Sequence, residues 1–351
     1  MIRPSLLPGA LAAGAVVALL VVVAWLVPVS YVALAPGPTA DTLGEWEGEK
    51  LVTVTPSTSE ESDGELLMTT VLVLEHLNLA DAVIGWLDPT EAVVPEESIF
   101  PSDRTREEYD QINEELFTDS EDAATTAALT YLGYPTEVRV VNVTEGGPSD
   151  GRLKADDVIT AVDGTAVSTT TDLISVVGAT DPGTTLTVEY TRDGAAASVA
   201  LVTEQPESGP HRSVIGVLVA TEPTADVDVD IQAEGIGGPS AGLMLALSIV
   251  DQLTPGDLTG GQVIAGTGEI SPEGEVGAIG GVRQKVIAAG DEGAGVFLLP
   301  PPNCRDAVKT VPEGVRLVPV TSLEGAVDAL TSLADGDEAA DLPSCTPGSS
   351  D

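Results

Sequence analysis

The first forty residues constrain the architecture of this chain more than any other stretch. No charged side chain occurs from Pro4 to Ala40, and Ala10 to Val27 consists almost entirely of Ala, Leu, Val and Gly. Eighteen helical residues rise about 27 Å, which is close to the thickness of the hydrocarbon core of a bilayer. The sequence therefore predicts a transmembrane helix over residues 10–27, inside an N-terminal anchor of residues 1–40.

The residues that flank the apolar segment indicate its orientation. Arg3 precedes the segment, whereas acidic residues follow it from Asp41 onward. A positive flank on the cytoplasmic side places the rest of the chain outside the cytoplasm. A cleaved signal peptide is the alternative, because Ala33-Leu34-Ala35 is similar to a signal-peptidase site. Pro36 directly after that site and the length of the apolar stretch favour a single-pass anchor in the cell membrane.

Charge and cysteine content limit the partners and the compartment. The 351 residues include 56 acidic and only 14 basic side chains, which gives a formal net charge of −42. We therefore exclude nucleic acid as a partner, because the chain has little with which to neutralise phosphates. Cys304 and Cys345 are too few for a disulfide framework and lack the spacing of a metal site. They could form a single bridge if the domain lies outside the cytoplasm.

The rest of the chain divides into regions of different pattern. Residues 41–130 combine strand-like runs with helical periodicity, which predicts an N-terminal α/β region. Residues 131–204 contain short strands, turns and one short helix, which is typical of a small β-rich domain. Residues 205–334 alternate buried strands with apolar helices, and residues 335–351 have the composition of a disordered tail. The expected fold class is mixed, α+β or α/β.

Residues 205–334 carry the side chains that we expect to do chemistry. Gly238-Pro239-Ser240-Ala241-Gly242 places a serine at a helix N-terminus, where backbone amides can stabilise an oxyanion. Lys285 follows in an apolar helix over residues 282–289. Burial lowers the pKa of a lysine, so that its neutral amine can take the proton of a serine hydroxyl. The pattern predicts Ser240 as nucleophile and Lys285 as general base.

Simpler and rival interpretations of these residues also exist. A serine after glycines is often only a helix cap, and a helical lysine is often a solvated surface residue. The G-x-S-x-G pattern also occurs in α/β-hydrolases, but there the histidine follows the serine, whereas His76 and His211 both precede Ser240. The sequence has no H-E-x-x-H cluster and no G-x-x-x-x-G-K-[ST] loop. We therefore expect no metal, no cofactor and no ATPase activity.

Residues 131–204 resemble a bacterial PDZ domain. Tyr131-Leu132-Gly133-Tyr134 is similar to the carboxylate-binding loop of that family, and 146–153 and 157–164 are similar to its body. The Gly-Asp that usually precedes one strand is Asp156-Asp157 here. The resemblance implies that Leu132, Gly133 and Tyr134 hold the C-terminus of a peptide, which joins the domain as an added strand.

Residues 237–289 resemble the proteolytic domain of Lon proteases. Three motifs occur in the order of that family: Gly238–Gly242, Thr267–Ile270 with Gly274–Gly281, and Lys285 with Ala288-Ala289. The resemblance implies that Ser240 and Lys285 are catalytic, with Thr267 and Gly238 in supporting positions. From about Val32 to Leu333, the chain is similar to membrane-anchored, PDZ-containing Lon-like proteases of bacteria.

The sequence therefore predicts a membrane-anchored serine endopeptidase whose PDZ domain recruits protein or peptide substrates. Lon-type domains assemble into rings, so the resemblance also implies a homo-oligomer. The missing ATPase module leaves open whether a separate ATPase unfolds the substrates. The alternative is a non-catalytic membrane scaffold that binds the C-termini of partners. Because a pseudoenzyme should have lost Ser240 or Lys285, the presence of both favours the enzyme.

Overall fold

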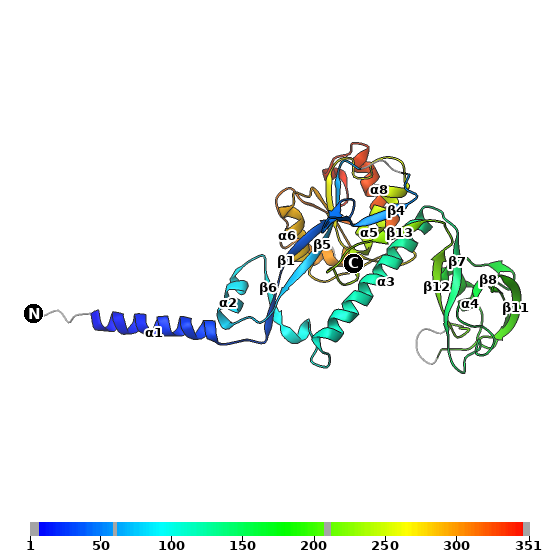
Figure 1. Ribbon diagram of the computed structural model, residues 1–351, viewed down its shortest axis with the longest axis horizontal. Helices are drawn as coiled ribbons and strands as arrows, with labels where there is room; N and C mark the ends of the chain where they lie inside the picture. Colours follow the sequence, from blue (N-terminus) through cyan, green and yellow to red (C-terminus); the bar gives the residue numbers. More distant parts are fainter. Residues whose placement is uncertain (1–6, 59–61, 207–211, 347–351) are drawn as a thin grey trace, which may run out of the picture.

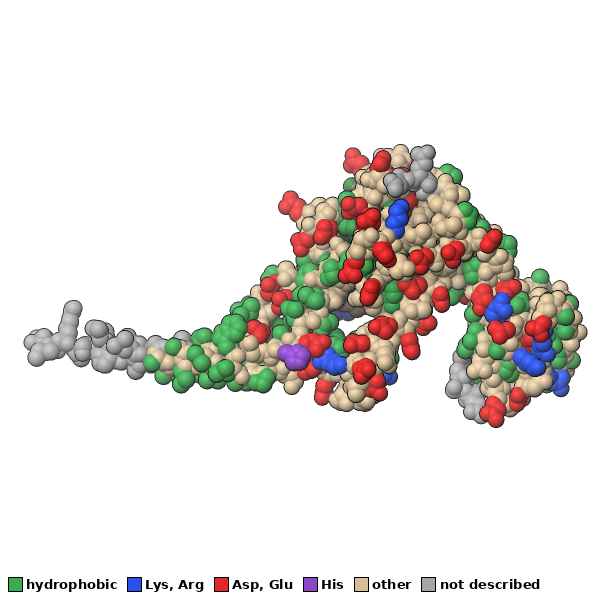
Figure 2. Space-filling model, viewed as in Figure 1, with side chains coloured by type: hydrophobic (Ala, Val, Ile, Leu, Met, Phe, Trp, Pro, Cys, Tyr) green, Lys and Arg blue, Asp and Glu red, His purple; other side chains and the backbone are tan. Residues whose placement is uncertain are grey.

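The computed structural model describes residues 7–58, 62–206 and 212–346. Helix α1 (Leu7–Leu26) projects from one end of a central α/β body, and a small β-rich module lies at the opposite end (Figure 1). The long helix α3 (Arg106–Tyr131) runs beside the body and ends next to the module (Figure 1). Acidic side chains are scattered over both folded parts (Figure 2).

The apolar N-terminal segment is helical, as predicted. The side chains of α1 that the structure describes are largely exposed, among them Leu19, Leu20 and Leu26. Within the described residues, however, no helix combines the length and the hydropathy that crossing a bilayer requires. The transmembrane helix expected over residues 10–27 gains no support from the structure and stays a prediction.

A six-stranded mixed sheet forms the middle of the body. Its order is β18-β17-β14-β5-β1-β6. Strands β5, β14, β17 and β18 are parallel, whereas β1 is antiparallel to both of its neighbours. The bounds are β1 (Tyr31–Asp41), β5 (Glu65–Leu74), β6 (Ala92–Pro95), β14 (Val263–Gly266), β17 (Val296–Leu299) and β18 (Arg316–Pro319). All four residues of β17 are buried, as expected for a parallel strand with both faces covered.

Helices cover both faces of this sheet. Side chains of β17 alternate between two cores: Leu298 faces α5 (Gly242–Leu253) and α8 (Leu323–Ala334), whereas Phe297 faces α6 (Val282–Asp291). This alternation follows from the period of two along a strand. The helix predicted over 282–289 is confirmed within two residues at each end, and α5 and α8 are among the apolar helices expected within 205–334.

The sheet changes the domain division expected from the sequence. Residues 41–130 do not form a separate α/β region, because β5 pairs with β14 of the predicted proteolytic region. The anchor does not extend to residue 40, because β1 pairs with β5 and β6. A further antiparallel pair joins β4 (Val52–Thr55) to β13 (Asp228–Ile231). Backbone pairing across such distances in sequence leaves no local pattern.

The β-rich module has its own sheet and its own core. Strands lie in the order β11-β10-β8-β7-β12, with β9 paired to β8. The bounds are β7 (Thr136–Val143), β8 (Val158–Val162), β9 (Thr165–Ala166), α4 (Thr170–Gly178), β10 (Thr185–Arg192), β11 (Ala195–Val202) and β12 (Val217–Pro223). Since β12 pairs with β7, the module extends to Pro223 and not to residue 204 as expected.

The C-terminal segment is folded as far as the structure describes it. Cys304 and Cys345 form a disulfide with their Cα atoms 5.3 Å apart. Leu342 and Cys345 are buried, and the Cys345 amide donates to the carbonyl of Leu317. The disordered tail expected over 335–351 is therefore wrong for residues 335–346, because the disulfide holds this segment against β18. Residues 347–351 lie outside the described part.

The remaining elements are short. They are β2 (Glu45–Trp46), β3 (Glu49–Lys50), α2 (Leu79–Leu87), η1 (Glu96–Ser98), η2 (Pro239–Ala241), β15 (Glu269–Ile270), β16 (Val276–Gly277), η3 (Pro301–Asn303), α7 (Cys304–Ala307) and η4 (Ala339–Asp341).

Candidate active site

Ser240 lies in η2, a single turn that leads into α5. The turn begins at Gly238, whose φ of 84° lies in a region that L side chains rarely adopt. Pro239 follows at the first helical position, where its missing N–H costs nothing. The Gly238 amide donates to the carbonyl of Asn113 at 3.0 Å. That amide is therefore engaged, and an oxyanion hole near Ser240 has to use other backbone amides.

Lys285 approaches Ser240 from helix α6. The helix starts after Gly281, where φ is 67° and an added Cβ would lie only 2.5 Å from Cγ2 of Val71 on β5. This close approach holds the first turn of α6 against the sheet. Only 3% of Lys285 is exposed, and its Nζ lies 2.5 Å from Ser240 Oγ. The structure thus brings together the two side chains that the sequence predicts as nucleophile and base.

Thr267 completes the cluster from the end of β14. Its Oγ1 lies 3.0 Å from Lys285 Nζ and donates to the carbonyl of Ser240 at 3.0 Å. A hydroxyl has one proton, so with that proton on the carbonyl, Oγ1 accepts from the lysine. Thr267 is fully buried, which fixes this arrangement. The hydrogen bond to Thr267 therefore orients the amine, and its lone pair can point toward Ser240 Oγ.

Burial controls the proton affinity of the lysine. Desolvation lowers the pKa of Lys285 to about 7, although the nearby charge of Glu269 acts in the opposite direction. A neutral amine is therefore accessible near neutral pH, which a general base needs. Within the described ranges, no group of three or more His, Cys, Asp or Glu side chains is arranged to hold a metal ion.

Helix α3 supports the serine loop through residues that the sequence did not identify. Ser120 Oγ donates to the carbonyl of Pro239 at 3.1 Å, and the carbonyl of Asn113 accepts from Gly238. Gly242 allows this contact, because an added Cβ would lie 2.7 Å from Ser120 Oγ and 2.8 Å from Ile270 Cγ2. Both supporting residues lie in an acid-rich helix without a motif, so no sequence signal distinguishes them.

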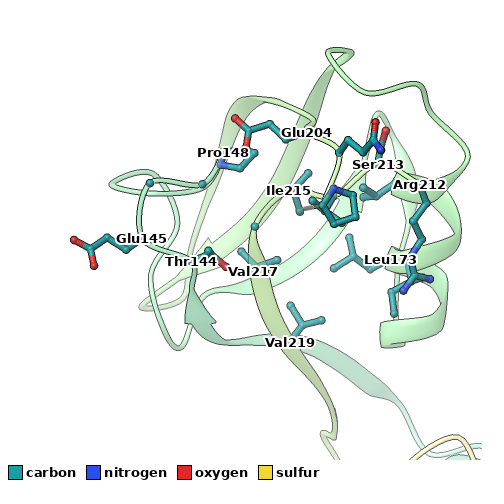
Figure 3. A pocket seen from close by; sticks show the side chains of 18 residues that line it. Thr144, Glu145, Pro148, Leu173, Glu204, Arg212, Ser213, Ile215, Val217 and Val219 are labelled. Carbon is teal, nitrogen blue, oxygen red and sulfur yellow. The ribbon is translucent and has the colours of Figure 1, made fainter. Parts of the chain in front are cut away.

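A separate groove lies in the β-rich module. It has a volume of about 600 Å³ and runs between α4 and β12. Leu173 from α4 and Val219 from β12 face each other across it, whereas Glu145 points away (Figure 3). The lining comes from apolar residues of α4 and β12, from the turn before β12, and from the loop 144–148 after β7. A few polar residues also line it, among them Glu204, Arg212 and the buried Ser213. Among the residues that the structure describes, β12 is the last strand of its sheet, and no further strand pairs with its outer edge.

The predicted peptide-binding residues do not line this groove. Leu132 ends helix α3, and Gly133 follows with a φ of 77°, a common way for a helix to end. The Tyr134 amide donates to the carbonyl of Leu129, and Leu132 and Tyr134 pack against the core of the body. The segment from Val214 to Gly216, which precedes β12, lines the groove instead.

Comparison with known proteins assigns both folded parts. Residues 215–330 match the Lon protease (S16) C-terminal proteolytic domain, and residues 108–203 match the PDZ domain. The Lon protease of Phenylobacterium zucineum is 31% identical over 147 residues, which cover 40% of this chain and 17% of that protein. Lon protease 2 of Herpetosiphon aurantiacus is 39% identical over 93 residues, which cover 26% of this chain and 11% of that protein.

Among solved structures, the PDZ domain of an SdrC-like protein from Listeria monocytogenes is 22% identical. The match covers 23% of this chain and 85% of the Listeria chain, with a TM-score of 0.22. The chain spans less than a fifth of the length of the curated relatives it matches. The matches to the two domain families confirm the mixed α+β class with a PDZ domain and a Lon-type proteolytic domain. The Lon domain match and the Lon relatives support a serine peptidase.

Proposed function

We propose that this chain is a membrane-anchored serine endopeptidase that uses Ser240 as nucleophile and Lys285 as general base. The observation that carries the proposal is the distance of 2.5 Å between Nζ of the buried Lys285 and Oγ of Ser240. A lysine enters an apolar interior at a cost unless its charge is lost, so a structural role alone gives no reason for it. The same contact favours an enzyme over the alternative, a non-catalytic scaffold.

The chemistry follows from the positions of these atoms. The neutral amine of Lys285 takes the proton of Ser240 as Oγ attacks the scissile carbonyl. Lys285 then gives this proton to the leaving amine, and the acyl group stays on Oγ. A water molecule, activated by the same amine, attacks the ester, releases the acid and restores Ser240. Thr267 keeps Nζ aligned throughout, because its own proton is held by the carbonyl of Ser240.

The first test compares the full chain with Ser240→Ala. We expect the parent chain, purified in detergent, to degrade a loosely folded protein and Ser240→Ala to leave it intact. The variant should keep its thermal stability, because Ser240 contributes no core side chain. Degradation by Ser240→Ala at the parent rate would exclude this serine as the nucleophile.

We also propose that the groove between α4 and β12 recruits substrate. An extended peptide can add to the open edge of β12, where backbone hydrogen bonds supply affinity and the apolar lining selects side chains. Recruitment and chemistry then lie in different modules, joined by α3. Protein or peptide segments are the substrates that this arrangement suits. A ring of several copies, implied by the Lon resemblance, belongs to the same proposal.

A charge inside the groove should separate recruitment from chemistry. We expect Ile174→Glu to weaken the binding of a peptide by about tenfold or more, a loss of roughly 1.4 kcal/mol. Ile174 lines the groove and is 48% exposed, so the change is compatible with folding. Val202→Glu is the matched control, since Val202 is 52% exposed in the same module but does not line the groove.

Binding is measured by fluorescence anisotropy of labelled peptides. Turnover is measured separately with short peptides that do not depend on the groove. Turnover of the short peptides should be the same in Ile174→Glu and Val202→Glu. An equal loss of binding in both variants would contradict the assignment of the groove.

We place the body outside the cytoplasm, held by the N-terminal helix. Disulfides persist in oxidising compartments, which suits the bond between Cys304 and Cys345. The sequence supports the same orientation, because Arg3 precedes the apolar segment and acids follow it. The exposed apolar side chains of α1 also favour contact with lipid over contact with water.

A further inference from the structure

We infer that helix α2 lies in the interfacial layer of a lipid bilayer, next to the point where α1 leaves it. The inference rests on the proposed membrane location and adds a second contact surface to it. This surface consists of Leu79, Val83, Ile84, Trp86 and Leu87, and we call it the α2 face.

The α2 face is apolar and points away from the protein. Exposed fractions rise along it from 40% at Leu79 through 60% at Trp86 to 80% at Leu87. The side of α2 that packs against the protein consists instead of the small residues Ala82 and Gly85. A helix on a water-soluble surface has the opposite arrangement, with its large apolar side chains inward. The exposed side of α2 therefore suits an apolar environment.

The spacing of these residues produces one continuous stripe. Positions 79, 83, 86 and 87 follow the i, i+4, i+7 and i+8 pattern of a single helical face. The N-terminus of α2 is capped, because Asn78 and Asp81 form a reciprocal capping box. The carboxylate of Asp81 is thus engaged with the backbone, and the stripe itself carries no charged side chain.

Backbone hydrogen bonds fix α2 to the base of α1. The Leu79 amide donates to the carbonyl of Val27 at 2.9 Å, and the Val29 amide donates to the carbonyl of Leu77 at 3.0 Å. Helix α2 therefore begins where α1 ends, and the two cannot separate without breaking these bonds. Any bilayer that surrounds α1 meets α2 at its surface.

The exposed apolar surfaces of the two helices are continuous. Trp25 and Leu26 at the end of α1 are 54% and 74% exposed, and hydrophobic side chains extend from α1 onto α2 (Figure 2). The rings of Tyr31 and Trp86 meet edge to face with centroids 6.0 Å apart. Tyrosine and tryptophan are enriched at the boundary between hydrocarbon and water, which is the level we assign to this pair.

The charge of the chain indicates what kind of contact this is. With a net charge of −42, the protein gains nothing from anionic headgroups. The contact is therefore apolar, and zwitterionic lipid suffices for it. Because α2 also contacts β1 and β6, a fixed α2 holds the central sheet close to the membrane.

Quenching of single tryptophans in the full chain tests this inference. Trp25, Trp46 and Trp86 are the three tryptophans. Three variants each keep one of them and carry phenylalanine at the other two. Each is reconstituted in phosphatidylcholine nanodiscs, with and without bromine on the upper part of the acyl chains. Trp46 is the internal control, because it packs against the core of the body and its Nε1 donates to the carbonyl of Glu234.

We expect brominated lipid to quench the emission of Trp86 and to leave that of Trp46 unchanged. Quenching of Trp25 with none of Trp86 would overturn the α2 inference and leave the anchor standing. Quenching of neither would remove both the anchor and the inference. Emission of Trp86 that changes with protein concentration, and not with bromine, would assign the α2 face to a second copy of the chain and also overturn the inference. Peptidase activity in the same nanodiscs reports separately on the Ser240 proposal.

Discussion

Lys285→Arg should abolish peptide-bond hydrolysis. Arginine stays protonated at any pH at which the protein is folded, so it cannot accept the proton of Ser240. Loss of a general base lowers the rate by about 10²–10⁴-fold. The measurement is cleavage of a short peptide, with Ser240→Ala as the reference for a site without a nucleophile. Turnover by Lys285→Arg near the parent rate would mean that another group activates the serine.

The pH dependence of the parent chain tests the same residue without a mutation. Burial lowers the pKa of Lys285 to about 7, and only the neutral form is a base. Activity should therefore be low in acid, rise with pH through about 7 and level off above it. A profile that rises only near pH 10 would show a lysine that is not desolvated in the working enzyme.

Lys285→Met separates the catalytic role of the lysine from its effect on stability. Between pH 7 and 10.5 the unfolded chain holds a proton on Lys285 that the folded chain has lost, so the free energy of unfolding rises with pH in this window. The folded state therefore bears a cost at neutral pH, on the order of 3–5 kcal/mol. We expect Lys285→Met to be inactive yet more stable at pH 7. Its advantage should disappear above pH 10.5, as urea titrations at several pH values would show.

The residues of the candidate active site were predictable because their local sequence already imposes the backbone geometry of the site. Glycines around Ser240 and before Lys285 provide backbone conformations that other residues rarely adopt. An apolar helix around one lysine in turn indicates that the lysine is buried. The contact among Ser240, Lys285 and Thr267 is thus encoded in short segments, although their roles in turnover stay predictions.

The elements that support the site were harder to predict from the sequence. Strand β1 contains Pro36, Gly37 and Pro38, which conceal a strand whose partners lie on β5 and β6. Strand β12 was expected in the proteolytic domain, because nothing in its own residues records that it pairs with β7. Ser120 likewise reaches Pro239 only through the packing of α3 on the body. Pairing and packing between distant segments decide these features.

The disulfide also connects distant segments, and its removal should lower the stability of the fold. Cys304 and Cys345 close a loop with a separation of 41 residues. The loss of chain entropy in the unfolded state corresponds to about 4 kcal/mol for a loop of this length. We expect the double variant Cys304→Ala, Cys345→Ala to lose roughly that amount of unfolding free energy in urea titrations. The parent chain treated with a reductant should lose a similar amount.

The loss of stability should affect the catalytic site as well as the C-terminal segment. Asn303, next to Cys304, donates to the carbonyl of Ile279 at 2.7 Å and accepts from its amide at 3.0 Å. Ile279 precedes the turn at Gly281 from which the Lys285 helix starts. Peptidase activity of the double variant should therefore match the parent at low temperature and fall at a lower temperature than the parent does. Unchanged unfolding and inactivation temperatures would show that packing of Leu342, which the variant keeps, holds the segment without the bond.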